Sequence, residues 1–374
     1  SASDTGTNEG VDQYAQIVRD LVAKHNLGPI KMGLVKHDMT PDYLREILGS
    51  GAIIRGLDGY KPLQLRDIEK TARFVPVMGA EPIMRCLAEN PDVVITSRTS
   101  DCCPFAAFAM HHGYSPDLAY FWGKVLECGS FVAYPKLVNH SVIGTIYEDK
   151  IAVTAIHEDQ QVTPVSLRKH AGYERSTFGG EAVAGGFIHI GGMEARQVDE
   201  KTAEAWGSRF EPSQGYNVKL EGAGYVGHKA EYLVGIRSQS FIKNLDEILA
   251  YTTQQIKDFY QDAEYEIYFA KYGLNGILGE MEPRKKAQAH EVGLMIEVVS
   301  ADKALAMEIA KLAGRLLLFT PILSERGSAG RVQLRNEESS YYGMAYRWTM
   351  NHIIEYASVE DAAVHFPVTY ELVH

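Results

Sequence analysis

The residues best suited to chemistry lie in one loop, residues 97–104, which reads Ser97-Arg-Thr-Ser-Asp-Cys-Cys-Pro104. A helix is expected to begin at Pro104, and the free backbone N–H groups of its first turn favour an anion beside the loop. Arg98 can hold a carboxylate through two parallel hydrogen bonds. The loop therefore predicts a site for a small acidic ligand, with Arg98 and Ser100 as substrate-binding residues.

Asp101 and Glu127 are the candidate catalytic residues. Asp101 can act as a base in this loop, or it can simply cap the helix that follows. Cys102 would have a lowered pKa if exposed near a helix start, but buried cysteine is the commoner state. Glu127 ends the next expected helix, where the helix dipole disfavours a carboxylate unless it has an interaction partner or a functional role. We expect Asp101 and Glu127 to form an acid/base pair.

Two more cations are candidate substrate-binding residues. Lys229 lies in a glycine-punctuated turn, residues 224–231. The turn is either a plain hairpin, or it lets Lys229 contact an oxyanion or a carboxylate. Arg331 lies in a segment rich in glycine and arginine, residues 325–338. This segment can close over an acidic ligand or form a solvated surface of ion pairs.

Three histidines raise the question of a metal. His140, His157 and His170 flank a short Thr-Pro-Val segment, and with Glu158 or Asp159 they can supply an acid/base pair or metal ligands. Lone histidines at irregular spacing are more often structural, and neither a CxxC pair nor an HExxH motif is present. A divalent metal stays an open alternative, and no redox cofactor is required.

The elements that must position these residues alternate between strand and helix in the first third of the chain. Repeated alternation with short apolar strands predicts a parallel sheet covered by helices on both faces. Ligands bind beyond the carboxyl ends of such strands. The strands are expected at residues 30–35, 74–77 and 92–96, and the loops that should meet are residues 1–8, 37–38, 78–81 and 97–103.

The predicted fold class is α/β, with a parallel Rossmann-like sheet followed by an α+β second part. Residues 1–130 are expected to form the Rossmann-like domain, without its first strand. Residues 131–374 are expected to form an α+β domain with a mixed sheet. Its expected elements are strands at residues 150–154, 186–190, 218–225, 232–236 and 292–299 and helices at residues 241–260 and 302–312.

Composition restricts the partners. The 374 residues include 37 Lys and Arg against 48 Asp and Glu, a net charge of -11, so a nucleic-acid backbone would be repelled. No apolar run approaches the roughly 18 residues of a membrane-spanning helix. The four cysteines all fall between residues 86 and 128, and Cys102 and Cys103 are adjacent, which fits a reducing compartment. We expect a cytoplasmic protein that binds neither nucleic acid nor membrane.

Taken together, these motifs resemble those of the acyclic terpene utilisation family, the AtuA-like proteins. The matching segments, in order, are Met78-Gly-Ala-Glu-Pro-Ile83, Asp92-Val-Val-Ile-Thr96 with Arg98 and Asp101, Leu126-Glu-Cys-Gly129, Tyr173-Glu174, and Gly224-Tyr-Val-Gly227 with Lys229-Ala-Glu231. Two departures stand out. Family members usually begin with a further glycine-rich strand and helix, and their Gly-Arg-Val-Ala-Asp-Pro loop corresponds here to residues 97–104.

The resemblance implies catabolism of acyclic terpenes such as citronellol and geraniol, or of other branched organic acids and their CoA thioesters. The leading hypothesis is an enzyme for a small branched carboxylic acid or its CoA thioester. Arg98 would anchor the carboxylate, and Asp101 and Glu127 would serve lyase or hydratase chemistry.

Two rivals come from other classes. A chain that truly begins at Ser1 would place a hydroxyl beside an α-amine, as in hydrolases with an N-terminal nucleophile. A non-catalytic scaffold subunit could instead use the tyrosine-rich segment, residues 339–346, to pack against a copy of itself or against a partner. We expect a homo-oligomer under either the enzyme or the scaffold hypothesis.

Overall fold

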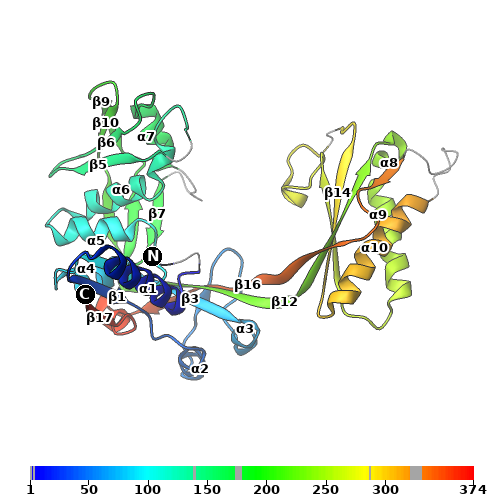
Figure 1. The fold of residues 1–374 in the computed structure, drawn as a ribbon, viewed down its shortest axis with the longest axis horizontal. Helices are drawn as coiled ribbons and strands as arrows, with labels where there is room; N and C mark the ends of the chain where they lie inside the picture. The colour runs from blue at the N-terminus through cyan, green and yellow to red at the C-terminus, as the bar shows by residue number, and fades with distance from the viewer. Residues whose placement is uncertain (1, 3–4, 138–139, 173–178, 286–287, 321–330) are drawn as a thin grey trace. The chain divides into compact units, whose positions relative to one another are not determined.

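The computed structural model describes residues 2, 5–137, 140–172, 179–285, 288–320 and 331–374. The chain divides into two compact units (Figure 1). Unit 1 comprises Ser1–Ala223 and Trp348–His374, and unit 2 comprises Gly224–Arg347. Two long strands, β12 (Tyr216–Ile236) and β16 (Ser340–Tyr356), contribute to both units. Each unit has its own cluster of buried apolar side chains, so each has its own hydrophobic core.

A three-stranded sheet in unit 1 carries the loops of interest. Its order is β17 (Val368–Val373), β1 (Ile30–Val35) and β4 (Val93–Thr96). β1 runs parallel to β4 and antiparallel to β17. The parallel pair places the carboxyl ends of β1 and β4 together, with Val35 opposite Thr96.

The prediction of a parallel Rossmann-like sheet is wrong. β3 (Arg73–Val77), expected as a third parallel strand, pairs antiparallel with β12 instead. Apart from β1 with β4, all the paired strands for which a register is described are antiparallel. Strand–helix alternation gives the order of elements along the chain, but it does not specify hydrogen-bond partners that come from much later in the sequence.

Two helices in the first third of the chain begin at a threonine that caps them. The Thr7 hydroxyl accepts from the Gly10 N–H, and the Thr40 hydroxyl accepts from the Tyr43 N–H before the first-turn Pro41. The helices of the first third are α1 (Asn8–His25), α2 (Pro41–Gly49), α3 (Leu65–Lys70), α4 (Glu81–Leu87), α5 (Cys103–His111) and α6 (Pro116–Leu126). The expected cap at Thr40 is confirmed.

The rest of unit 1 is built from short antiparallel strands. One sheet has the order β5 (Val142–Ile146), β6 (Ile151–Ala155), β10 (Thr202–Trp206) and β9 (Glu194–Gln197). A second has the order β11 (Arg209–Pro212), β8 (Gly186–His189) and β7 (Gly180–Val183). The remaining elements are β2 (Arg55–Gly56), the 3₁₀ turn η1 (Gly129–Phe131), α7 (Pro164–Ala171) and α11 (Val359–Ala363).

Unit 2 packs helices against an antiparallel sheet. Its strands are β13 (Glu266–Tyr272), β14 (Val292–Ser300), β15 (Val332–Leu334) and parts of β12 and β16. Its helical elements are α8 (Gln239–Lys243), α9 (Leu245–Phe259), α10 (Lys303–Phe319) and the 3₁₀ turn η2 (Gly279–Met281). The helix expected at residues 241–260 is divided at Asn244, and the strands expected at 218–225 and 232–236 are one strand, β12.

Hydrophobic periodicity accounts for this packing. Alternate residues of β14 are buried from Val292 to Ser300, as for a strand with one face on a core. The buried residues of α10, among them Ala306, Ile309, Ala310 and Ala313, recur at intervals of three and four. Among the described residues, no helix is both long and apolar enough to cross a bilayer.

Candidate functional site

Loops from four parts of unit 1 lie side by side at the carboxyl ends of β1 and β4. The Arg98 N–H donates to the Gly6 carbonyl at 2.8 Å, and the Arg98 carbonyl accepts from the Met78 N–H at 3.0 Å. The Asn8 side chain donates to the His37 carbonyl at 2.7 Å and accepts from the His37 N–H at 3.1 Å. Backbone hydrogen bonding therefore fixes these loops relative to one another.

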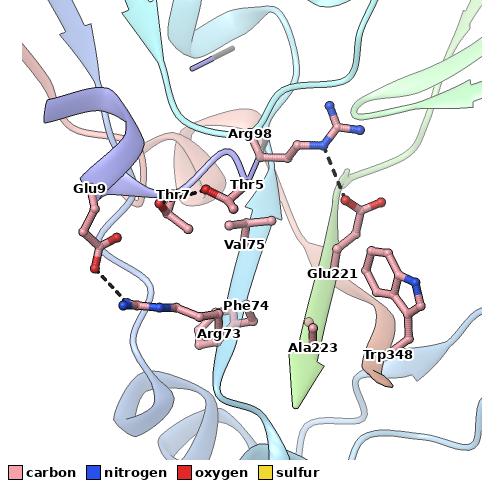
Figure 2. Close-up of a pocket in the computed structure, with 11 residues that line it drawn as sticks. Thr5, Thr7, Glu9, Arg73, Phe74, Val75, Arg98, Glu221, Ala223 and Trp348 are labelled. Atoms are coloured by element: carbon pink, nitrogen blue, oxygen red, sulfur yellow. Dashed lines mark hydrogen bonds and ion pairs between the residues drawn. The ribbon is translucent and has the colours of Figure 1, made fainter. Parts of the chain in front are cut away.

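A cavity of about 400 Å³ lies beside these loops (Figure 2). This volume is within the range of small-molecule sites, about 300–1,000 Å³. All of its lining residues belong to unit 1, namely Thr5, Thr7, Glu9, Arg73, Phe74, Val75, Arg98, Glu221, Gly222, Ala223 and Trp348. Since these come from the N-terminal loop, α1, β3, β12 and β16, distant parts of the sequence assemble the wall.

Arg98 is fixed at the wall by three groups. Its Nη1 donates to the Asp101 carboxylate and to the Thr99 carbonyl, both at 2.7 Å. Its Nε lies 3.4 Å from Oε2 of Glu221, an ion pair drawn in Figure 2. In the described part of the chain no group accepts a hydrogen bond from Nη2, and the side chain is 29% exposed. A pre-oriented guanidinium edge is thus available to an anion.

The remaining wall is apolar in one part and polar in another. Phe74, Val75, Ala223 and Trp348 contribute hydrocarbon and aromatic surface. Away from Arg98, Arg73 Nη1 donates to Glu9 Oε1 at 2.8 Å (Figure 2). The cavity therefore combines a cationic edge with an apolar surface, which is the combination that an amphiphilic acid requires.

Ser100 and Asp101 lie next to Arg98 in the loop. The Ser100 N–H donates to the Met78 carbonyl at 3.0 Å, and its hydroxyl lies 4.0 Å from the Cys102 sulfur. Asp101 is 62% exposed, and its carboxylate accepts from Arg98. Neither residue lines the cavity directly. Asp101 holds Arg98 in place, and the possible role of Ser100 in binding stays a prediction.

Glu127 is at the carboxyl end of α6, as expected, and it has a partner. Lys124, one turn earlier, donates a hydrogen bond to its carboxylate, and the Glu181 carboxylate of β7 lies 2.8 Å from the same ammonium. The Glu127 side chain is 7% exposed. Burial raises the pKa of Glu127 to about 7, with a contribution from the Asp101 charge, although Lys124 opposes the rise. Glu127 is not among the residues that line the cavity.

Lys229 and Arg331 belong to unit 2. Lys229 is paired with Glu297 at 2.8 Å and with Glu231 at 2.9 Å, and its ammonium lies 4.0 Å from the centre of the Tyr342 ring. Arg331 is buried at the start of β15, where its carbonyl accepts from the Arg237 N–H. The structure therefore brings Arg98, Ser100 and Asp101 together in one loop and places Glu127 in a separate buried group with Lys124 and Glu181. It assigns the other two cations to another unit.

Sequence comparison agrees with this ordered set of motifs. The model of the acyclic terpene utilisation family, described as "Acyclic terpene utilisation family protein AtuA", matches residues 5–351. The chain belongs to the AtuA family. Neither the curated proteins nor the solved structures gave a match.

The AtuA match covers the cavity wall and the Lys124, Glu127 and Glu181 group. Of the motifs that carried the resemblance, Tyr173-Glu174 lies outside the described residues, and so does Ser1, the nucleophile of the hydrolase hypothesis. The glycine-rich turn, residues 224–231, is part of β12.

A metal site is not apparent in the described part of this AtuA chain, where no group of three or more His, Cys, Asp and Glu side chains is arranged to bind an ion. The rings of His140 and His157 lie 4.2 Å apart, between centroids. The His170 Nε2, in contrast, lies 3.0 Å from the Val125 carbonyl on α6. The divalent metal stays an open alternative for the whole chain.

Several residues of the site were not predicted from the sequence. Glu221 and Trp348 approach Arg98 only because β12 and β16 complete the wall. Glu81 accepts a hydrogen bond from the buried Tyr216 hydroxyl, and burial raises the pKa of Glu81. Of these residues, only Lys124 could have been predicted from the sequence, because a lysine three residues before Glu127 on a helix can reach its carboxylate.

Proposed function

We propose that this chain is a catabolic enzyme of acyclic terpene utilisation that binds a small branched carboxylic acid in the unit 1 cavity. The role in acyclic terpene utilisation follows from the family. The observation that supports the substrate class is that Arg98, whose Nη2 has no described hydrogen-bond acceptor, lines the same cavity as Phe74, Val75, Ala223 and Trp348. A carboxylate would pair with the guanidinium, and a branched hydrocarbon chain would contact the apolar wall.

The free acid suits this arrangement better than a CoA thioester. A guanidinium pairs with a carboxylate through charge-assisted hydrogen bonds, whereas a thioester carbonyl is uncharged. Asp101 and Glu221 already offset the charge of Arg98, and Lys219 Nζ lies 2.7 Å from Glu221. The positive charges of Arg98 and Lys219 are matched by the negative charges of Asp101 and Glu221. This part of the site therefore has no excess positive charge to balance the several phosphates of CoA. The CoA thioester is therefore the second substrate form to be tested.

The reaction we propose is addition or removal of water or another small group by acid/base chemistry, as in a hydratase or lyase. Asp101 and Glu127 are the proposed pair; neither lines the cavity, so the proposal requires the substrate to extend past Arg98 to reach them. A carboxyl group with a pKa near 7 suits proton transfer at neutral pH, and this supports the choice of Glu127. Asp101 is ion-paired with the proposed anchor, Arg98. Asp101→Asn and Glu127→Gln should each lower turnover by about 10²- to 10⁴-fold.

Calorimetric titration tests the binding proposal. Geranate and citronellate should bind, and their methyl esters and CoA thioesters should bind at least about tenfold more weakly because they lack the charged partner. Arg98→Ala should remove this preference for the free acid, whereas Lys229→Ala in unit 2 should keep it. Equal affinity for acid and methyl ester in the unaltered protein would show that Arg98 is not the anchor.

Turnover is tested separately. Loss of the ultraviolet absorbance of the conjugated double bond in geranate would report hydration in the unaltered protein. Binding without any turnover, across a panel of saturated and unsaturated branched acids, would contradict the enzyme proposal. It would favour the non-catalytic alternative instead.

A further inference from the structure

Lys124 is a buried cation that is paired with two carboxylates. Its side chain is 5% exposed, and that of Glu127 is 7% exposed. Its ammonium donates to Glu127 on the same helix and lies 2.8 Å from Glu181 Oε2 on β7. Removing charges from water is costly unless they are paired. One ammonium lies between two carboxylates, and because Glu181 is 28% exposed and stays partly hydrated, the cost of the second negative charge falls mainly on the buried Glu127.

A proton is the simplest way to balance this charge. Burial is the main reason that the pKa of Glu127 rises to about 7, and the charges of Glu181 and Asp101 add to the rise. Burial lowers the pKa of Lys124, but its hydrogen bond to Glu127 and its ion pair with Glu181 outweigh this and raise it, so the lysine stays charged. Near neutral pH the group therefore exchanges one proton, mainly at Glu127.

The surrounding elements hold the group in place. Lys124 and Glu127 are three residues apart at the end of α6, so their side chains lie on one face. Glu181 approaches from β7, and Asp101 acts from the loop after β4. From α7, His170 lies with Nε2 3.0 Å from the Val125 carbonyl on the same turn of α6. These are the titratable groups of the neighbouring elements whose contacts or charges bear on Glu127.

We propose that Lys124 is the positioning residue for Glu127: with Glu181 it holds the Glu127 carboxyl group in a triad that keeps one exchangeable proton for the reaction. The name triad refers here to Lys124, Glu127 and Glu181. This inference rests on the proposed function for its purpose, since Glu127 is the acid/base residue there. The triad itself can be tested without any substrate.

Carbon-13 NMR of the glutamate carboxyl groups, titrated between about pH 4 and 9, tests the triad directly. The Glu127 signal is assigned by its loss in Glu127→Gln. Its midpoint should lie near 7 in the unaltered protein. Glu181→Gln should lower this midpoint by about one pH unit, because it removes a like charge. Lys124→Met should raise the midpoint, and Lys124→Arg should leave it close to the unaltered value.

The pH dependence of the free energy of unfolding gives a second test, for which the direction of the change is defined. The folded-state pKa of Glu127 lies above the ordinary value of 4.5, so the folded protein holds the extra proton between these two values. The contribution of Glu127 to stability is therefore complete below about pH 4.5 and is lost as pH rises through about 7. Glu127→Gln should flatten this part of the stability curve. Asp42→Asn, in the exposed pair with Arg45 at the same spacing, should leave it unchanged.

The outcomes separate the triad from the proposed function. If Glu181→Gln leaves the Glu127 midpoint unchanged, the triad is wrong whatever the enzyme does. If Lys124→Met does not fold, Glu181→Gln and Lys124→Arg still decide the question. If the midpoints move as expected but no branched acid is turned over, the proposed function fails and the triad stands. If turnover is found, its pH profile should shift with the midpoint in Glu181→Gln, and an unshifted profile would refute the positioning role.

Discussion

Arg98 in unit 1 and Lys229 in unit 2 have the same nominal surroundings, one cation beside two carboxylates. Arg98 contacts Asp101 and Glu221, and Lys229 contacts Glu231 and Glu297. Their availability to a ligand differs. The guanidinium has five donors in a rigid fork, Arg98 lines the cavity, and no described residue accepts a hydrogen bond from its Nη2.

The ammonium of Lys229, in contrast, is already paired on more than one side. It has three N–H donors, and the carboxylates of Glu231 and Glu297 both lie within ion-pair distance of it. The centre of the Tyr342 ring lies 4.0 Å away. Burial lowers the pKa of Lys229, but hydrogen bonds to Glu297 and Glu231 outweigh this and raise it, so the charge is retained for structural pairing. A cation near two carboxylates is therefore a binding candidate only when its donor geometry leaves an edge open at a cavity.

Replacing each cation should give the largest contrast. Arg98→Ala should weaken binding of geranate by about 10- to 100-fold, because a charge-assisted bidentate contact contributes about 1.5–3 kcal/mol. Lys229→Ala should change it by less than about twofold, within the effect of distant surface changes. Titration calorimetry measures both. An equal loss of geranate affinity in the two variants would show that Arg98 and Lys229 do not differ in ligand binding.

Stability should respond in the opposite order. Lys229→Met leaves Glu231 and Glu297 facing each other without a cation, and it should lower the free energy of unfolding by about 2 kcal/mol. Arg98→Met should cost about 1 kcal/mol or less, since Asp101 is exposed and Glu221 keeps Lys219. Urea unfolding of both variants is the check. A larger loss for Arg98→Met would mean that Arg98 is mainly structural.

The shape of the guanidinium can be tested with its charge kept. Arg98→Lys should weaken binding of geranate by about tenfold, since an ammonium cannot hold Asp101, the Thr99 carbonyl and a ligand in one plane. Lys229→Arg should leave this affinity unchanged. Competition titrations against the unaltered protein resolve this difference. If Arg98→Lys binds geranate as tightly as the unaltered protein, binding requires only the positive charge and not the shape of the guanidinium.

The smallest expected effect concerns the carboxylates. Glu221→Gln removes a negative charge beside the proposed binding edge, and it should tighten binding of the free acid by about threefold. Glu297→Gln, the matched change beside Lys229, should have no effect on binding. Both are measured with the acid and its methyl ester. Tighter binding of the ester as well would indicate altered packing and not relief of repulsion.

The sequence alone determined the local elements and the loop that carries the anchor. Apolar periodicity predicted the residues of β1, β3 and β4, and Thr40 with Pro41 predicted the start of α2. Arg98 and Asp101 are three residues apart in one loop, so their contact depends on short-range geometry. Glu127 was recognised as a carboxylate that needed a partner at a helix end, and Lys124 is that partner.

Only the tertiary structure decided which distant segments face these residues. Glu221 and Trp348 reach the cavity because β12 and β16 complete the wall, and Glu181 reaches Lys124 from β7. The parallel sheet was predicted wrongly for the same reason, since β3 pairs with β12 and β1 with β17, both far along the chain. Residue type and spacing set local conformation, whereas strand pairing depends on competition among hydrogen-bond and packing partners across the whole chain.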